Sequence, residues 1–366
     1  MRFWASLAAC LLASCGAKKV NPTFHAVENP ASLSAWGVVN VSKGELVMGE
    51  SVLPYSLNTP LFTDYAHKLR TIWVPEGTAQ YREGDVLEFP VGTVISKTFY
   101  YPSNEGDIVR KEKDLRPVTA KAGLKLSDNR LIETRLLVRR DAGWEPLSYI
   151  WNVDETDAKL TRIGAIVKMT LADKGELTPF NYAVPNINQC AGCHAPNNTT
   201  RVLSPIGPKA RHLNGDYTYA DGTINQLDKW IEVGYLNEAP TERPRSAVWN
   251  ENLDTLDARL RAYLDVNCAH CHNPVGPADT SGLHLNPENQ SLPHLGICKN
   301  AVAAGSGTGG RKYDIAPGAP DNSIMLYRME TRDPGAMMPE LGRSLTHIEG
   351  VKLVDAWIAG METVCD

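Results

Sequence analysis

The sequence predicts a multidomain α+β protein, in which an N-terminal antiparallel β sandwich or barrel precedes two mainly α-helical modules. Its 366 residues exceed what one hydrophobic core usually organises. Residues 20–180 contain many runs of β-branched and aromatic residues, and beyond them apolar residues recur at helical spacing. We therefore expect a leader at 1–14, a β-rich domain at 20–180, and modules at 181–238 and 251–366.

The leader is short and apolar. MRFWASLAACLLASCG has a basic start at Arg2 and an apolar run to Ala13 that is too short to cross a bilayer. The run ends in Leu-Ala-Ser-Cys15, which resembles the lipobox of bacterial lipoproteins, where residues 1–14 would be removed and the cysteine would carry lipid. Gly16 favours the outer membrane, so we expect an anchored protein in the periplasm or on the cell surface. An ordinary secretory signal is the alternative.

The β-rich domain is predicted from strand-like runs that are bounded by turn-forming residues. The runs are Arg70–Val74, Thr93–Tyr101 and Arg130–Val138, and the turns are Pro75–Gly77, Glu83–Asp85 and Ser127–Asn129. This pattern is typical of an antiparallel sandwich or barrel.

The helical modules are predicted from apolar spacing and from helix-capping residues. Residues 224–234 form an amphipathic pattern that ends on Gly, and residues 253–264 carry Leu and Tyr at helical spacing. A Pro-rich link at 239–244 separates them. Thr346–Glu349 is a capping-box pattern that would begin a final helix.

Two copies of one five-residue motif use half of the eight cysteines. Residues 190–194 read CAGCH and residues 268–272 read CAHCH. Zinc ribbons pair their CxxC motifs about 15–20 residues apart, whereas 74 residues separate Cys193 from Cys268. A redox dithiol of the thioredoxin type expects a βαβ setting, which neither motif has.

The pattern C-x-x-C-H is instead that of c-type haem attachment. Two thiols on one helical turn match the separation of the two porphyrin vinyl groups, and the following His binds the iron. We therefore expect two covalently attached haems and two cytochrome c-like modules. The attachment cysteines are Cys190, Cys193, Cys268 and Cys271, and the iron ligands are His194 and His272.

The sixth ligand of the second iron is predicted from a Met-Pro pair. The segment 335–342 reads GAMMPELG, and we expect Met338 to bind because Pro339 follows it directly. The first module has no Met between its motif and Cys268, and its only further His is His212, which comes soon after Gly207-Pro208. Three alternatives stay open for the first iron: His212, a residue donated by the β-rich domain, or an open position. The candidate donors are Met169, His67 and His25.

The remaining cysteines suggest one disulfide. Cys10 would be lost with the leader and Cys15 would be lipidated. Cys298 and Cys365 are then left over, and they would pair in an oxidising compartment.

With these motifs, the chain resembles a family of secreted, often lipid-anchored, bacterial two-haem c-type cytochromes with a β-rich N-terminal domain. Beside the two motifs, the resemblance is carried by the strings at 59–66, 89–93 and 337–344. It implies redox partner proteins, and genes of this family are often neighbours of a parallel β-helix repeat lipoprotein, a further partner. A net charge of −5 argues against nucleic acid, and membrane contact would be through the lipid anchor only.

We therefore interpret the sequence as an electron carrier between redox partners, which needs no catalytic acid, base or nucleophile. A two-haem oxidoreductase, similar in logic to bacterial cytochrome c peroxidase and with an open first iron, is the main alternative. A binding module, in which the β-rich domain captures a ligand, is the third.

Overall fold

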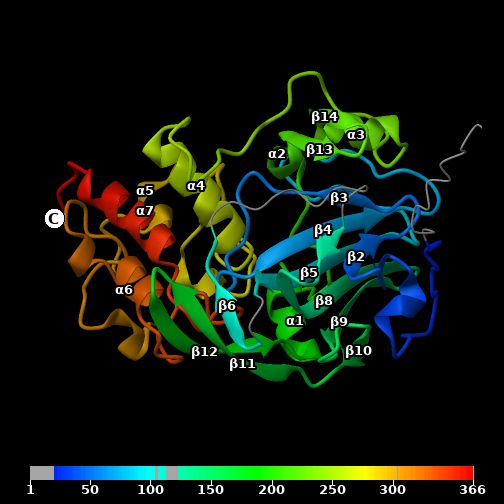
Figure 1. Ribbon diagram of the computed structural model, residues 1–366. Helices are drawn as coiled ribbons and strands as arrows, with labels where there is room; N and C mark the ends of the chain where they lie inside the picture. The colour runs from blue at the N-terminus through cyan, green and yellow to red at the C-terminus, as the bar shows by residue number, and fades with distance from the viewer. Residues whose placement is uncertain (1–19, 104–105, 113–122, 303, 366) are drawn as a thin grey trace, which may run out of the picture.

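The computed structural model describes residues 20–103, 106–112, 123–302 and 304–365 (Figure 1). The predicted signal peptide at 1–14 and the predicted lipidation site Cys15 lie outside these ranges.

Strands dominate the described residues, at 29%, whereas helices account for 20% and form seven short segments. The expected fold class, with two mainly α-helical cytochrome c-like modules at 181–238 and 251–366, is therefore wrong. The longest helices in the described ranges, α4 (Leu256–Asn267) and α7 (Ile348–Ala359), have 12 residues each. The helical spacing read at 224–234 begins in a strand, and the helix there, α3 (Gln226–Glu232), has 7 residues. Between the helices, Gly and Pro residues favour turns over helix.

The centre of the molecule is a six-stranded antiparallel sheet in the order β10-β9-β8-β5-β4-β3. Its strands are β3 (Leu53–Tyr55), β4 (His67–Trp73), β5 (Val94–Pro102), β8 (Asn129–Arg140), β9 (Gly143–Trp151) and β10 (Ala158–Thr161). One face packs on a small sheet of β1 (Val39–Ser42), β2 (Glu45–Met48) and β7 (Leu124–Lys125).

The other face of the central sheet is partly covered by the segment that follows the first motif. Figure 1 shows α2 (Ala210–Leu213), α3 and the hairpin of β13 (Asp216–Tyr219) and β14 (Gly222–Asn225) above this sheet. Leu213, Leu227 and Trp230 are fully buried there, in one core with Ile72 and Ile95 of the sheet. Burial of such large side chains explains why this short segment is ordered.

A third group of strands joins the two halves of the chain. β11 (Ala165–Asp173) pairs antiparallel with β12 (Glu176–Val184) and parallel with β6 (Ile108–Arg110). Their core includes Leu345, and Figure 1 shows this hairpin between the central sheet and the C-terminal helices.

The C-terminal segment has its own core between α4, α6 (Ile324–Glu330) and α7. A disulfide joins Cys298 to Cys365, with their Cα atoms 5.3 Å apart. The predicted capping box is not formed, because His347 is the N-cap of α7 and makes no side-chain cap bond. Glu349 instead forms an ion pair with Lys111, 2.8 Å away.

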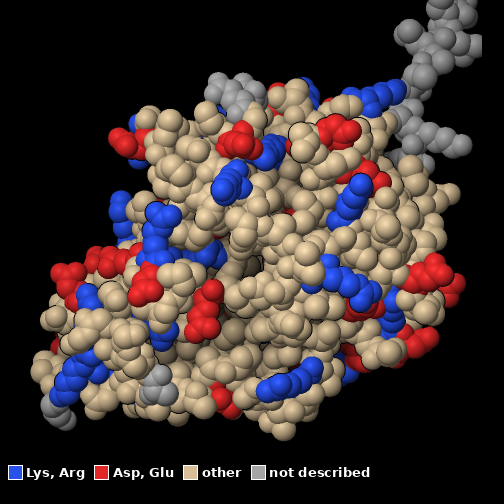
Figure 2. All heavy atoms as spheres, turned by 90° about the horizontal axis from the view of Figure 1, so that it is seen from below, with Lys and Arg blue, Asp and Glu red and all other residues tan. Residues whose placement is uncertain are grey.

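The surface of the described residues carries mixed charge. Figure 2 shows acidic and basic side chains interspersed on the face seen from below. In the described part of the chain, no helix is long and apolar enough to cross a membrane.

Candidate functional site

Both CxxCH motifs line one cavity of about 880 Å³, between the central sheet and the C-terminal segment. All four motif cysteines and both motif histidines face this space, and among the described residues these cysteines form no disulfide. The structure therefore brings together two motifs that are far apart in the sequence.

The first motif lies on α1 (Ile187–His194), which begins with a capping box. The Asn186 side chain accepts the Gln189 N–H at 2.9 Å, and the Gln189 side chain accepts the Asn186 N–H at 2.9 Å. This fixes the first helical turn. Because residues three and four apart share a helix face, Cys190, Cys193 and His194 point to one side.

The second motif extends α4 by one turn. The Thr255 hydroxyl caps the start of this helix, and Cys268 is its C-cap. The carbonyl of Cys268 accepts the N–H groups of Cys271 at 3.1 Å and His272 at 2.9 Å. This turn gives the second motif the same one-sided arrangement of thiols and imidazole as the first.

Each motif histidine is held in one tautomer by its Nδ1 atom. His194 Nδ1 lies 3.0 Å from the Ser204 carbonyl, which can only accept, so Nδ1 carries the proton. His272 Nδ1 lies 3.1 Å from the Ser281 hydroxyl, whose own proton goes to the Ala278 carbonyl at 2.7 Å. Both rings therefore present an unprotonated Nε2, the atom that a metal would need.

Burial keeps both rings neutral near pH 7. Desolvation lowers the pKa of His194 to about 3 and that of His272 to about 4. The partner of His194, Ser204, lies three residues before Gly207-Pro208 in the same loop.

The thiols do not have the electrostatics of a redox dithiol. Burial raises the pKa of Cys268 and of Cys271 to about 12, and it also raises the pKa of Cys190 and Cys193. A reactive dithiol needs a lowered pKa. The dithiol alternative is therefore less well supported by this site.

The two motifs are in contact at Gly192. Cys271 Sγ lies 3.9 Å from the Gly192 carbonyl, and a Cβ at Gly192 would lie 3.2 Å from Leu341. The glycine of CAGCH thus leaves room for Leu341 of the Met-Pro segment beside α1.

A buried ion pair links the two motif-bearing segments. Arg211 on α2 donates two hydrogen bonds to Asp265 on α4, at 2.7 and 2.9 Å. His212 Nε2 lies 2.7 Å from the same carboxylate. These bonds hold the pKa of Asp265 well below its usual range against the opposing effect of burial. Such bidentate, fully buried pairing fixes orientation strongly.

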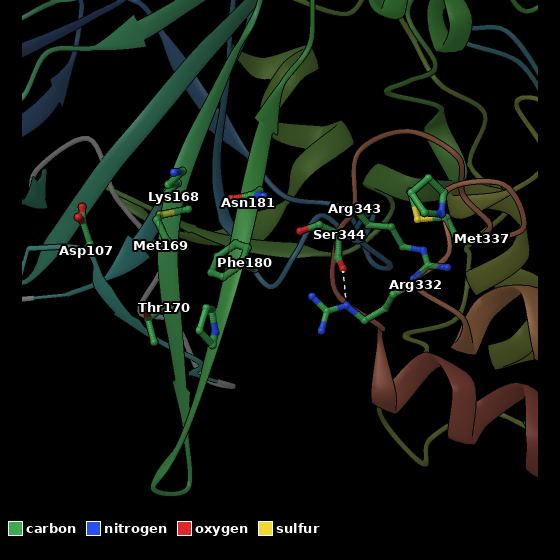
Figure 3. Close-up of a pocket in the computed structure, with 12 residues that line it drawn as sticks. Asp107, Lys168, Met169, Thr170, Phe180, Asn181, Arg332, Met337, Arg343 and Ser344 are labelled. Atoms are coloured by element: carbon green, nitrogen blue, oxygen red, sulfur yellow. Dashed lines mark hydrogen bonds between the residues drawn. The ribbon is translucent and has the colours of Figure 1, made fainter.

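The predicted sixth ligands lie in different places. Met338 lines the main cavity, and its backbone is fixed by an N–H bond to the Arg328 carbonyl at 2.7 Å and by Arg343 Nε at 3.0 Å. Met337 lines the main cavity and also a second one of about 500 Å³, where Figure 3 shows it near Arg332 and Arg343. Of the two methionines of this segment, only Met338 is confined to the motif cavity, which Met325 and Met329 also line.

The candidates for the first iron are less favourably placed. His212 lines the cavity, but its Nε2 is bound to Asp265, so only Nδ1 is free. Met169 lines the second cavity, beside Phe180 (Figure 3). His67 and His25 are absent from the described lining of the main cavity.

Several cavity residues were not predicted from the sequence. His270, the residue before Cys271 in the second motif, lines the cavity with a buried Nδ1 that has no partner among the described residues. His347 is stacked on Phe62, with ring centroids 4.1 Å apart, and its Nδ1 lies 2.9 Å from the Tyr263 hydroxyl. Only their residue type could have drawn attention to them.

The loop at 58–66 contains the string at 59–66 and contacts the chain beside both the second motif and the Met-Pro segment. The Phe62 N–H donates to Asn267 at 2.8 Å, next to the second motif. Asp64 accepts the N–H groups of Ser344 and Leu345, each at 2.7 Å, beyond the Met-Pro pair. This loop therefore positions the second motif and the segment that follows the Met-Pro pair.

Comparisons with protein-family models, with curated proteins and with solved structures found no match for this chain. Within the described ranges, no three or more His, Cys, Asp or Glu side chains are grouped to hold a metal ion. A porphyrin iron takes four ligands from its ring, so one or two protein side chains complete it. The residues present fit that requirement.

Proposed function

We propose that this protein carries two c-type haems, attached at CAGCH and CAHCH, and transfers electrons between redox partners outside the cytoplasm. The single observation that carries the proposal is the shared cavity, in which both motifs meet with the Nε2 atoms of His194 and His272 unprotonated. The lipobox-like leader supports the compartment.

The chain's own residues would do three things in this function. The four motif cysteines would hold the two haems through thioether bonds, each thiol adding its S–H across one vinyl group. Ser204 and Ser281 hold the two imidazoles in orientation. Met338 would supply a neutral sulfur to the second iron, which favours the ferrous form.

When bound, the haem supplies one-electron redox chemistry. The protein supplies proximity, because Cys271 of the second motif lies against the Gly192 carbonyl of the first. No acid, base or nucleophile is needed for this activity.

The test is the mass of the denatured protein made in a host that attaches haem c. We expect a gain of two porphyrins for the parent chain, and of one for the C190S/C193S variant and for the C268S/C271S variant. The matched control is C298S/C365S, which removes two cysteines outside the motifs and should keep both porphyrins. A parent chain without covalent porphyrin would overturn the proposal.

A low-temperature EPR spectrum of the oxidised protein separates electron transfer from peroxidase-like chemistry. Two low-spin signals and no turnover of peroxide agree with the carrier. A high-spin ferric signal that disappears in the C190S/C193S variant, together with peroxide turnover, would replace the carrier with the two-haem oxidoreductase.

A further inference from the structure

A row of polar and charged side chains crosses the cavity-facing side of the central sheet. Arg70 on β4 pairs with Lys97 on β5, and Lys97 pairs with Arg135 on β8. Tyr55 on β3 and Ser148 on β9 occupy the two ends of the row. All five line the cavity that contains the CxxCH motifs. Three cations therefore stand side by side at the floor of this cavity.

Like charges directly opposite each other in a sheet are unfavourable, and burial adds to this. Of these three cations, only Arg135 forms an ion pair with an acid among the described residues, because its Nε lies 2.9 Å from Glu133. Glu133 acts on Lys97 without forming an ion pair with it. Glu133 is fully buried and also accepts the Tyr182 hydroxyl at 2.7 Å. This cluster is electrically complete without any ligand.

Arg70 and Lys97 have no such partner. Among the described residues, neither makes a hydrogen bond or an ion pair with an acidic side chain, and Lys97 has only the ring of Phe99, 5.3 Å away. Burial lowers the pKa of Arg70. Burial, together with the charges of Arg135 and Arg70, lowers the pKa of Lys97 to about 7, against the opposing effect of Glu133.

None of the acidic side chains that line the cavity, among the described residues, forms an ion pair with Arg70 or Lys97. Asp265 is bound by Arg211 and His212, and Asp314 by Lys299 at 2.9 Å. In the described ranges, the other two lining acids, Asp85 and Glu340, form no ion pair with either cation. An anion bound in the cavity would balance this pair and would favour the charged form of Lys97.

We propose that Arg70 and Lys97 form an anion site in the floor of the cavity, beside the first motif, and that it takes a carboxylate or a similar oxyanion. The site is close to CAGCH, since the charge of Lys97 acts on both Cys193 and His194. A guanidinium fork with an ammonium beside it suits a two-oxygen acceptor. The inference rests on the proposed function and extends it.

Two sources share this chemistry. One is the propionate groups of the first haem, which would be held permanently. The other is a free oxyanion that enters the cavity as a ligand or substrate. The two sources can be distinguished, because only a free oxyanion would change the visible spectrum of the protein when it is added.

The experiment uses the full holoprotein with Arg70→Gln and Lys97→Gln. The control is Lys159→Gln, which removes an exposed lysine from β10 of the same sheet. Porphyrin content is measured first, by mass. Midpoint potentials and visible spectra are then recorded, with and without sodium acetate and sodium phosphate.

If the propionates fill the site, one haem potential falls in both cation variants without added salt, because loss of a cation favours the ferric state. If a free oxyanion fills it, the parent spectrum changes saturably with acetate or phosphate, and the midpoint concentration rises at least tenfold in both variants. Arg70→Lys, which keeps the charge, should recover part of either effect.

Potentials and anion responses equal to those of Lys159→Gln in both variants would overturn the inference. If the variants also retain two porphyrins, this outcome contradicts the anion site but agrees with the proposed function. Absence of covalent porphyrin from the parent chain would instead overturn the proposed function. Protection of that same chain against heat by acetate or phosphate, lost in Lys97→Gln, would still support the anion site.

Discussion

Burial of an uncharged histidine ties stability to pH at His67. Its Nε2 is buried without a hydrogen-bond partner among the described residues, and its ring lies beside Tyr100. Desolvation lowers the pKa of His67 to about 4, below the value of about 6.5 in the unfolded chain. The unfolded chain therefore binds the extra proton as the pH falls below about 6.5, and the folded state loses stability between there and about 4.

We expect His67→Gln to reduce the acid sensitivity. Between pH 7 and pH 5, His67 should lower the free energy of unfolding by about 2 kcal/mol, and the variant should lack this part. Denaturant titrations at the two pH values measure it. The exposed His294→Gln serves as the control, and equal pH dependence in both variants would contradict the expectation.

Met338 and Met337 form a matched pair for testing the iron ligand. Met338 faces only the motif cavity, whereas Met337 also lines the second cavity. With Met338→Ala we expect one haem to become high-spin and its potential to fall, because a neutral sulfur ligand stabilises ferrous iron. Met337→Ala should leave the spectrum unchanged. The reverse pattern would assign Met337 as the ligand.

Some residues of the site belong to short sequence motifs, whereas others become neighbours only in the folded chain. The two motifs and the Met-Pro pair could be selected from the sequence because each is a pattern of at most five residues, and all of them line one cavity. Arg70 and Lys97 could not, because only the pairing of β4 with β5 makes them neighbours. His270 has no sequence signal for burial, which arises from the packing of the whole site around it.

At the scale of elements, the sequence predicted strands better than helices. The runs at 70–74, 93–101 and 130–138 fall largely within β4, β5 and β8, because alternation and β-branching act within each strand. The helical pattern at 224–234 was too long, since a hairpin of four-residue strands takes its first residues. The predicted cap of the last helix failed because Glu349 forms an ion pair with Lys111, a residue distant in the sequence.

The loop at 58–66 holds the segment after Met338 through one carboxylate. Asp64 is 2% exposed and accepts two backbone N–H groups, from Ser344 and Leu345. Asp64→Ala removes the acceptor of the buried Leu345 N–H and of the partly buried Ser344 N–H, so we expect a loss of about 2–4 kcal/mol in the free energy of unfolding. Denaturant unfolding measures the loss.

Asp64→Asn is the matched variant for this loop. Asn keeps one acceptor oxygen and tolerates the left-handed backbone of this position, where φ is 46°. It should therefore lose less stability than Asp64→Ala. Equal losses would show that the negative charge, rather than the acceptor geometry, holds the segment.

The disulfide closes a loop that contains the Met-Pro segment. Cys298 and Cys365 are 67 residues apart in sequence, and Cys298 packs against the core of α4, α6 and α7. We expect the C298S/C365S variant to lose about 2–4 kcal/mol of stability, chiefly because the unfolded chain gains freedom. Thermal unfolding measured without reductant checks this. An unchanged melting temperature in the variant would contradict it.

At the scale of the whole molecule, the segment after the first motif completes the central sheet. Trp230 of α3 is fully buried and lies against Tyr55 and Phe89, with ring centroids 5.7 and 6.4 Å apart. A chain ending at residue 180 would leave this sheet face without its cover. The apolar pattern of the strands could not reveal this, because it does not say which segment packs on which face.

The interleaved core makes the sheet and this segment one cooperative unit, which Trp230→Ala tests. Removing a fully buried Trp should lower the free energy of unfolding by about 3–5 kcal/mol. Because the core is shared, we expect hydrogen-exchange protection to fall in β4 and β5 as much as in α3. Trp357→Ala, in the C-terminal core, is the control and should leave these amides less affected. Loss of protection confined to α3 would mean that the sheet folds independently of the segment that covers it, and the motif cavity would then lie between two separate units rather than within one.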